Sequence, residues 1–235
     1  MKTYKEKIKQ YGDNISVLEE EIDLKLQMEY LKESANVKKV LDAVQVLKDK
    51  NKLFDDGMSL SDKRILLSKL ASVNEVEAFR TLELYKQKPD KSLMEWSVLA
   101  YQESKMLLES SLLDKPPLFI STGLGGKGTK LRYFIVIKSI KGKYFSDFQT
   151  QVILKEIEYS FKKEEAELED IRFFGYFATL TVLIPLSVGL KTLLADVVQT
   201  CNEMGGFVDK RMLITNSRKL TLNQIKKAIE SSGNV

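Results

Sequence analysis

Histidine is absent from the 235-residue chain, and cysteine occurs once, as Cys201. The absence of histidine excludes Ser-His-Asp and Cys-His catalytic sites, histidine general bases and histidine metal ligands. One cysteine forms no intramolecular disulfide and, without histidine, builds no zinc site of the usual Cys/His type. We therefore expect no catalytic residue, no metal and no cofactor. Cys201 is interpreted as a small core residue in the middle of a helix.

The apolar segments of a signal peptide or a membrane span are also missing. The first residues, MKTYKEKIKQYGDN, are polar and charged, so a cytoplasmic location is expected. The longest uncharged run, 173–190, has 18 residues, and about 20 apolar residues cross a bilayer. However, Thr179 and Thr181 alternate along this run, Pro185 interrupts it, and Ser187 can cap a new helix. We interpret the run as a strand followed by a helix and expect no membrane contact.

Positive charge is concentrated in the second part of the chain. Residues 1–114 carry 19 basic and 21 acidic side chains, whereas residues 115–235 carry 18 and 12. The net charges are therefore −2 and +6. The stretch 115–143 holds seven lysines and arginines and no acidic residue. Such a stretch is either a solvated face or a patch that binds phosphate or an acidic partner.

Proline and glycine are scarce before residue 113, where the pattern is helical. Apolar side chains recur every three or four residues along 15–30 and 37–47. The pattern predicts an all-helical domain over 1–114, most simply a bundle. The helices predicted between residues 60 and 113, joined by a Pro-Asp turn, also resemble HEAT repeats. That resemblance would imply a short solenoid that binds other proteins.

Two consecutive prolines, Pro116 and Pro117, end the helical pattern because they favour an extended chain. Beyond them, β-branched and aromatic residues become frequent, and we predict a second domain over 115–235. Its predicted strands are 118–122, 130–139, 166–174, 176–185 and 207–217. Its predicted helices are 147–165, 187–204, which a Gly-Gly pair ends, and 222–232, which Thr221 caps.

From Leu131 onward, the predicted order of strands and helices is βαββαβ, which is the ferredoxin-like order. The two most apolar strands, 131–137 and 178–184, would then be central, and the extra strand 118–122 would pair with 130–139. The predicted fold class is α+β. An N-terminal helical bundle, or a short HEAT-like solenoid, precedes a ferredoxin-like domain with an extra N-terminal strand and a C-terminal helix.

The two central strands are predicted to share a face that mixes aromatic, basic and hydroxyl side chains. That face would carry Arg132, Phe134 and Lys138 from one strand, and Phe177, Thr179 and Thr181 from the other. RNA-recognition sheets stack bases on aromatic rings and hold phosphates with arginine and lysine. The window 174–178 resembles the RNA-recognition-motif consensus in its glycine and one aromatic residue, but departs from it at the leading basic and second aromatic positions.

The glycine-rich loop 121–130, STGLGGKGTK, departs from the known nucleotide fingerprints. Its GxGxxG spacing precedes a strand rather than the helix that a pyrophosphate site needs. Lys127 is followed by glycine instead of the Ser or Thr of a Walker A motif, and no His-Arg-Asp or Asp-Phe-Gly of a kinase follows. The loop is either a plain hairpin connection or a loop that offers backbone amides, Lys127 and Lys130 to phosphates.

Together these features favour a non-enzymatic binding protein that contacts RNA or a ribonucleoprotein through its second domain. The predicted contact consists of Lys127, Lys130, Arg132, Phe134, Lys138, Phe177 and Arg211. An alternative is a protein–protein adaptor or assembly subunit whose sheet face is buried by a partner, a second copy or the N-terminal helices. A third is an enzyme that uses carboxylates, tyrosine or lysine, although the acid clusters at 19–21 and 164–170 show no defined acid–acid spacing.

Overall fold

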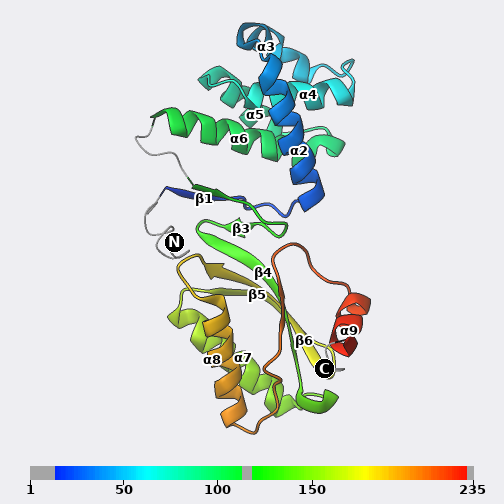
Figure 1. Cartoon of the computed structure of the whole chain (residues 1–235), viewed down its shortest axis with the longest axis vertical. Helices are drawn as coiled ribbons and strands as arrows, with labels where there is room; N and C mark the ends of the chain where they lie inside the picture. The colour runs from blue at the N-terminus through cyan, green and yellow to red at the C-terminus, as the bar shows by residue number, and fades with distance from the viewer. Residues whose placement is uncertain (1–13, 113–117, 232–235) are drawn as a thin grey trace. The chain divides into compact units, whose positions relative to one another are not determined.

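The computed structural model describes residues 14–112 and 118–231 and combines helices with an antiparallel sheet (Figure 1). Its internal contacts divide the chain into two compact units, of which one ends at Ile120 and the other begins at Ser121. The boundary predicted after residue 114 falls outside the described ranges. Because the helical unit extends to Ile120, residues 118–120 belong to it and not to the second unit.

The first unit packs five α-helices, within its described residues, around one apolar core. They are α2 (Leu24–Val37), α3 (Ala43–Asp49), α4 (Leu60–Ala71), α5 (Val76–Gln87) and α6 (Met94–Leu112), with the short 3-10 turns η1 (Lys38–Val40), η2 (Lys50–Phe54) and η3 (Lys91–Leu93). Helix α6 contacts α2, α4 and α5. Leu53, Leu67, Leu70 and Leu82 in the core are completely buried. The helical spacing of apolar residues predicted these helices, except over 15–23, where the structure has a strand at 15–17 and begins the helix only at Leu24.

A short parallel sheet also belongs to the first unit. Strand β1 (Ile15–Val17) pairs with β2 (Leu118–Ile120), and Ser16 lies opposite Phe119. The prediction that the first domain is all-helical is wrong in this detail, and so is the predicted pairing of 118–122 with 130–139. The segment 118–120 satisfies its backbone hydrogen bonds with a strand that is distant in sequence, which local patterns do not reveal.

The second unit contains a five-stranded antiparallel sheet among its described residues. Its strands are β3 (Gly126–Lys127), β4 (Lys130–Lys138), β5 (Glu167–Phe173), β6 (Phe177–Pro185) and β7 (Leu213–Thr215). The order runs β5, β6, β4, with both β3 and β7 paired to the other side of β4. Strands β4 and β6 are central, as predicted, because they are the most apolar strands and both of their faces are covered.

Helices cover both faces of this sheet. They are α7 (Asp147–Lys163), α8 (Leu190–Glu203) and α9 (Leu222–Ser231), and the turn η4 (Ile140–Gly142) follows β4. Helices α7 and α8 lie on one face and α9 on the other (Figure 1). Ile135, Leu180 and Val182 form the core beneath α7 and α8. On the other face of the sheet, Ile225 of α9 is fully buried against Phe134, Val136 and Phe177.

Two local predictions differ from the structure. The segment 207–217 is not one strand, because only a bridge from Ser139 to Val208 and the short β7 form there. The carboxylate of Asp209 accepts the backbone N–H of Arg211 at 2.9 Å and turns the chain between them. Ser187 does not cap α8, which begins at Leu190 after Gly189 with no side-chain cap.

Candidate functional site

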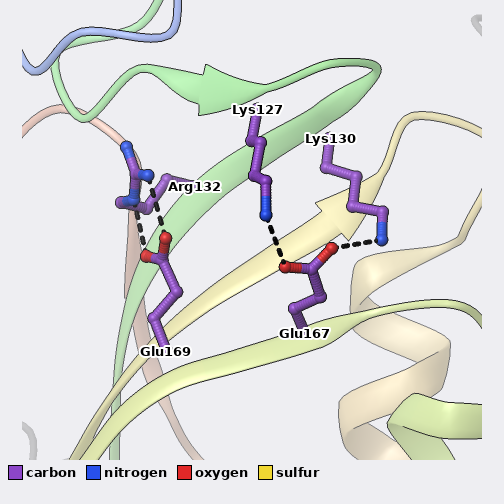
Figure 2. Close-up of polar contacts among 5 residues, drawn as sticks. All are labelled: Lys127, Lys130, Arg132, Glu167 and Glu169. Carbon is purple, nitrogen blue, oxygen red and sulfur yellow. Dashed lines mark hydrogen bonds and ion pairs between the residues drawn. The ribbon is translucent and has the colours of Figure 1, made fainter.

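Two of the predicted contact lysines lie together at one end of the sheet and share one carboxylate (Figure 2). Lys130 Nζ is 2.7 Å from Glu167 Oε1, and Lys127 Nζ is 3.4 Å from Oε2. The lysines come from the β3–β4 hairpin and the glutamate from β5. The hydrogen bond from Lys130, together with the positive charge of both lysines, lowers the pKa of Glu167. A phosphate at these lysines must therefore compete with Glu167.

Arg132 is held by the same edge strand. Its Nε and one Nη lie 2.6 and 2.9 Å from the two carboxylate oxygens of Glu169 (Figure 2). The other Nη donates to the carbonyl of Leu124 at 2.7 Å. A bulge interrupts β5 between Leu168 and Asp170, so Glu169 occupies the extra position and reaches Arg132 across β6. Glu167 and Glu169 belong to the acid cluster 164–170, which showed no defined spacing in the sequence. The strand order β4, β6, β5 brings them next to the cations of β4.

Lys138 and Arg211 share a second carboxylate at the other end of β4. Lys138 Nζ lies 3.6 Å and an Arg211 Nη lies 3.0 Å from Oδ2 of Asp209. Burial alone would raise the pKa of Asp209, but hydrogen bonds from Arg211 and the positive charge of Lys138 lower it overall. The side chain of Lys138 is largely buried, whereas that of Arg211 is 58% exposed. Only Arg211 of this pair is open to a large partner.

The two predicted stacking residues are buried. Phe134 is 7% exposed and Phe177 is 1% exposed, and both pack in one cluster with Ile225 of α9. The face that the sequence analysis expected to be open is therefore covered where these rings lie. Neither ring can stack on a base while α9 holds this position.

A stacked tyrosine pair, of which Tyr144 is exposed, lies beside Phe177 and was not predicted. The side chain of Tyr144 is 77% exposed and stacks on Tyr176, with ring centroids 6.5 Å apart and planes inclined by 28°. Gly175 lies beneath the Tyr144 ring, and a Cβ at that position would lie 3.1 Å from it. Lys141 and Lys143 precede the tyrosine, are exposed, and form no ion pair with another described residue. The sequence signal was the end of the acid-free stretch 115–143, directly before a tyrosine.

A second basic segment was not predicted as a contact, although one of its residues, Arg211, was. Residues 210–227 contain six lysines and arginines and no acidic residue. Lys210, Arg218, Lys226 and Lys227 in it are exposed and pair with no acid of the described chain. This segment contains the start of α9 and the loop before it. Arg218, Lys226 and Lys227 therefore add exposed positive charge on and beside α9.

The glycine-rich loop serves the packing of the hairpin. A Cβ on Gly123 would lie 1.8 Å from the carbonyl oxygen of Ser217, so only glycine fits this close approach of two backbones. The amide of Leu124 donates to Asn216 O at 3.0 Å, and that of Gly125 donates to Thr122 O at 3.2 Å. Two amides that a phosphate-binding loop would offer are therefore already used inside the protein.

Cys201 is 1% exposed, as predicted for a core residue, and burial together with the charge of Glu156 raises the pKa of its thiol to about 11. Within the described ranges, no group of three or more acidic or cysteine side chains could hold a metal ion. Across residues 14–112 and 118–231, no helix is long and apolar enough to cross a bilayer.

The second unit carries all the residues that the sequence analysis predicted as contacts. Its predicted cations lie beside acidic residues, its predicted rings are buried, and its exposed aromatic and basic side chains lie elsewhere on the same unit. Neither a protein-family model nor a curated protein sequence matches this chain.

Proposed function

We propose that the chain is a non-enzymatic binding protein that contacts single-stranded RNA, free or in a ribonucleoprotein, through its second unit. The observation that supports this proposal best is the exposed Tyr144 ring stacked on Tyr176, preceded by the exposed Lys141 and Lys143. Sequence-tolerant RNA contacts combine these same elements, because bases stack on aromatic rings while lysines hold the phosphates between them.

The seven residues predicted from the sequence take a smaller part in this proposal. The side chains of Lys127 and Arg211 remain 65% and 58% exposed, so each can contact a phosphate at the cost of a weak surface ion pair. Lys130, Arg132 and Lys138 are less exposed and ion-paired. These three side chains would contact RNA only if it displaced the acids that pair with them. Phe134 and Phe177 would contact RNA only if α9 moved away from them.

Charge reversal near Tyr144 tests the proposal. We expect Lys141→Glu with Lys143→Glu to reduce the salt dependence of RNA binding by about 1.4 in log–log slope, because two phosphate contacts are lost. We expect Tyr144→Ala to weaken binding by about tenfold through loss of one stacked base. The measurement is the fluorescence anisotropy of a labelled single-stranded RNA of about ten nucleotides, titrated between about 50 and 200 mM KCl.

A matched control is available on the opposite face of the sheet. Lys155→Glu with Lys162→Glu makes the same change in net charge on exposed positions of α7. If this control weakens binding as much as the test variant, the contact is not localised near Tyr144. If the wild-type chain fails to bind RNA at low salt, the proposal is wrong.

A second candidate function, a protein–protein adaptor or assembly subunit, is favoured by a feature of the first unit. Leu24, Met28 and Leu31 on α2 are 40%, 67% and 61% exposed. They follow each other at spacings of four and three residues, so they form one apolar stripe on the helix surface. Such a stripe is typical of helices that pair with another helix. Light scattering of the full chain separates this function from RNA binding.

We also propose a ferredoxin-like fold for the second unit and a helical bundle for the first. The strand order β7, β4, β6, β5 supports a ferredoxin-like second unit, because it places the first and third strands of the βαββαβ order in the centre. The contacts of α6 with three other helices support a bundle rather than a HEAT-like solenoid. A division into domains near residue 115 and a cytoplasmic location, which fits a single cysteine, are proposed with them.

A further inference from the structure

A groove of about 700 Å³ lies beside α9, on the part of its sheet face that the helix leaves uncovered. Thr179 and Thr181 of β6 form its floor, Asp170 and Arg172 of β5 line one side, and the residues that begin α9 line the other. The strand register explains this arrangement. Arg172 lies opposite Thr179, and Thr181 lies between Asp170 and Phe134, so all these side chains share one face. The volume is in the range of small-molecule sites.

The floor of the groove offers two hydroxyl groups that form no hydrogen bond within the described part of the chain. Thr179 and Thr181 are each only 7% exposed, and neither hydroxyl hydrogen-bonds another described residue. No fully buried side-chain oxygen of the described chain lacks a partner, so both hydroxyls open to the groove. Hydroxyls at nine-tenths buried positions normally pair inside the protein. Here a bound group can serve as the partner.

The surroundings of the hydroxyls define the chemistry of the bound group. Phe174 lines the groove as an apolar ring surface and stacks on Phe177 with ring centroids 5.3 Å apart, whereas only the edge of the buried Phe134 reaches the groove. The carboxylate of Asp170 can accept amino protons, and each threonine can both donate and accept. These features suit a planar ring with a hydrogen-bonding edge. They do not suit an alkyl chain, which would leave the hydroxyls and the carboxylate without partners.

The rim of the groove carries two cations that can hold a phosphate, Arg172 and Lys219, beside the acids Glu169 and Asp170. The side chain of Arg172 is 69% exposed, and its one ion pair among the described residues is with Asp170 at 2.9 Å, a type of surface pair that contributes little to stability. On the opposite side, Lys219 lines the groove together with Thr221 and Leu222. Thr221 caps α9 by accepting the N–H of Gln224 at 3.4 Å, so the positive end of the helix dipole lies at this wall.

We propose that this groove binds one unpaired base of a single-stranded RNA, with the phosphate next to it between Arg172 and Lys219. The inference rests on the proposed function and adds a site to it. The ring contacts from Phe174 to Phe177, from Phe177 to Tyr176 and from Tyr176 to Tyr144 connect the groove with the exposed stack. In this proposal one strand of RNA occupies both, with the groove reading a base edge and Tyr144 stacking without base preference.

Removal of the two hydroxyls tests the groove. Thr179→Val with Thr181→Val keeps the shape of the floor and deletes its hydrogen bonds, while Thr179→Ser with Thr181→Ser keeps the hydroxyls. The probes are labelled single-stranded homopolymers of A, C and U, each about ten nucleotides long, on the full chain. We expect the valine variant to lose about tenfold in affinity for the preferred homopolymer and to bind all three alike, because two base hydrogen bonds are lost.

The salt dependence separates this inference from the proposed function. The valine variant should keep the wild-type slope against salt, since its phosphate contacts are unchanged, and the serine variant should keep the base preference. If the valine variant binds all homopolymers as the wild type does while the Lys141→Glu, Lys143→Glu variant binds weakly, the groove inference fails and the RNA function stands. If the wild-type chain binds no homopolymer, both fail.

Discussion

At the scale of single residues, Glu167 controls the availability of Lys127 and Lys130. It accepts hydrogen bonds from both lysines, and the shorter one comes from Lys130, whose side chain is 23% exposed. Ion pairs of this exposure are partly screened by water and salt. The same carboxylate thus holds the β3–β4 hairpin to β5 and competes with any phosphate that approaches it.

We expect Lys130→Gln to raise the pKa of Glu167 toward the ordinary glutamate value of about 4.3, because the largest cause of its lowered pKa is the hydrogen bond from Lys130. The measurement is an NMR titration of the Glu167 carboxyl carbon. Lys155→Gln on α7 provides the control, which should leave this titration unchanged. An identical Glu167 titration in wild type and Lys130→Gln would contradict the assignment.

The same shift sets the direction of a pH effect on stability. The folded-state pKa of Glu167 is lowered, so the pair stabilises the fold above the pKa of the unfolded chain. This stabilisation is lost as the pH falls through the folded-state pKa. The protection factors of the amides at 126–131, which are corrected for the intrinsic pH dependence of exchange, should therefore fall in acid in the wild type and fall less in the Lys130→Gln variant.

At the scale of elements, α9 determines which aromatic residues are open. The helix has 10 residues, and isolated helices of that length are marginal in water. Its position therefore depends on tertiary packing, above all on the fully buried Ile225. By covering Phe134 and Phe177 and leaving Thr179 and Thr181 beside a groove, α9 divides one sheet face into a packed half and a half that can bind a ligand.

Helix α2 carries the element-scale prediction for the second candidate function. We expect the chain to self-associate as concentration rises through the stripe of Leu24, Met28 and Leu31, because apolar helix surface is removed from water on pairing. Met28→Lys with Leu31→Lys should keep the chain monomeric to about tenfold higher concentration. Size-exclusion chromatography with light scattering measures the effect.

The control for α2 uses exposed apolar residues of another helix. Val76 and Leu84 on α5 are 51% and 57% exposed, so Val76→Lys with Leu84→Lys adds the same charge away from the stripe. This control should associate as the wild type does. A wild-type chain that stays monomeric at every concentration, and that captures no partner through α2, would remove the observation that favours an adaptor.

At the scale of the whole molecule, the two units have separate hydrophobic cores. Leu70 belongs to the core of the helical unit, whereas Ile157 belongs to the core between the sheet and α7. Both side chains are almost completely buried. Separate cores allow each unit to open without the other, since the free energy of local unfolding follows the contacts of the segment involved.

We expect Leu70→Ala to destabilise the first unit by about 3 kcal/mol through the cavity it leaves. Amide protection should fall within 24–112 and stay unchanged in β4, β6 and α7. Ile157→Ala is the reciprocal variant and should show the opposite distribution. Native-state hydrogen exchange followed by mass spectrometry measures both. Equal loss of protection in the two units after either substitution would show that they unfold as one.

The sequence alone determined the class of fold and the type of most elements, but it missed the strand at 15–17 and overextended the one at 207–217. Periods of three to four residues predicted the helices of the first unit, and dense β-branched residues predicted β4, β5 and β6 with small errors at their ends. The apolar content of β4 and β6 also predicted that they are central. These properties follow from the order of neighbouring residues, because local hydrogen bonding and the burial of one face leave a periodic trace.

Only the tertiary structure decided which side chains are available at the candidate site. The partners of Lys130 and Arg132 come from β5, a strand more than thirty positions later in the chain. The cover over Phe134 comes from α9 near the other end of the unit. Alternation along a strand shows which residues share a face, but it contains no information on what packs against that face. Long-range packing therefore determined that Phe134 is buried, that Tyr144 is exposed, and that Thr179 and Thr181 open to a groove.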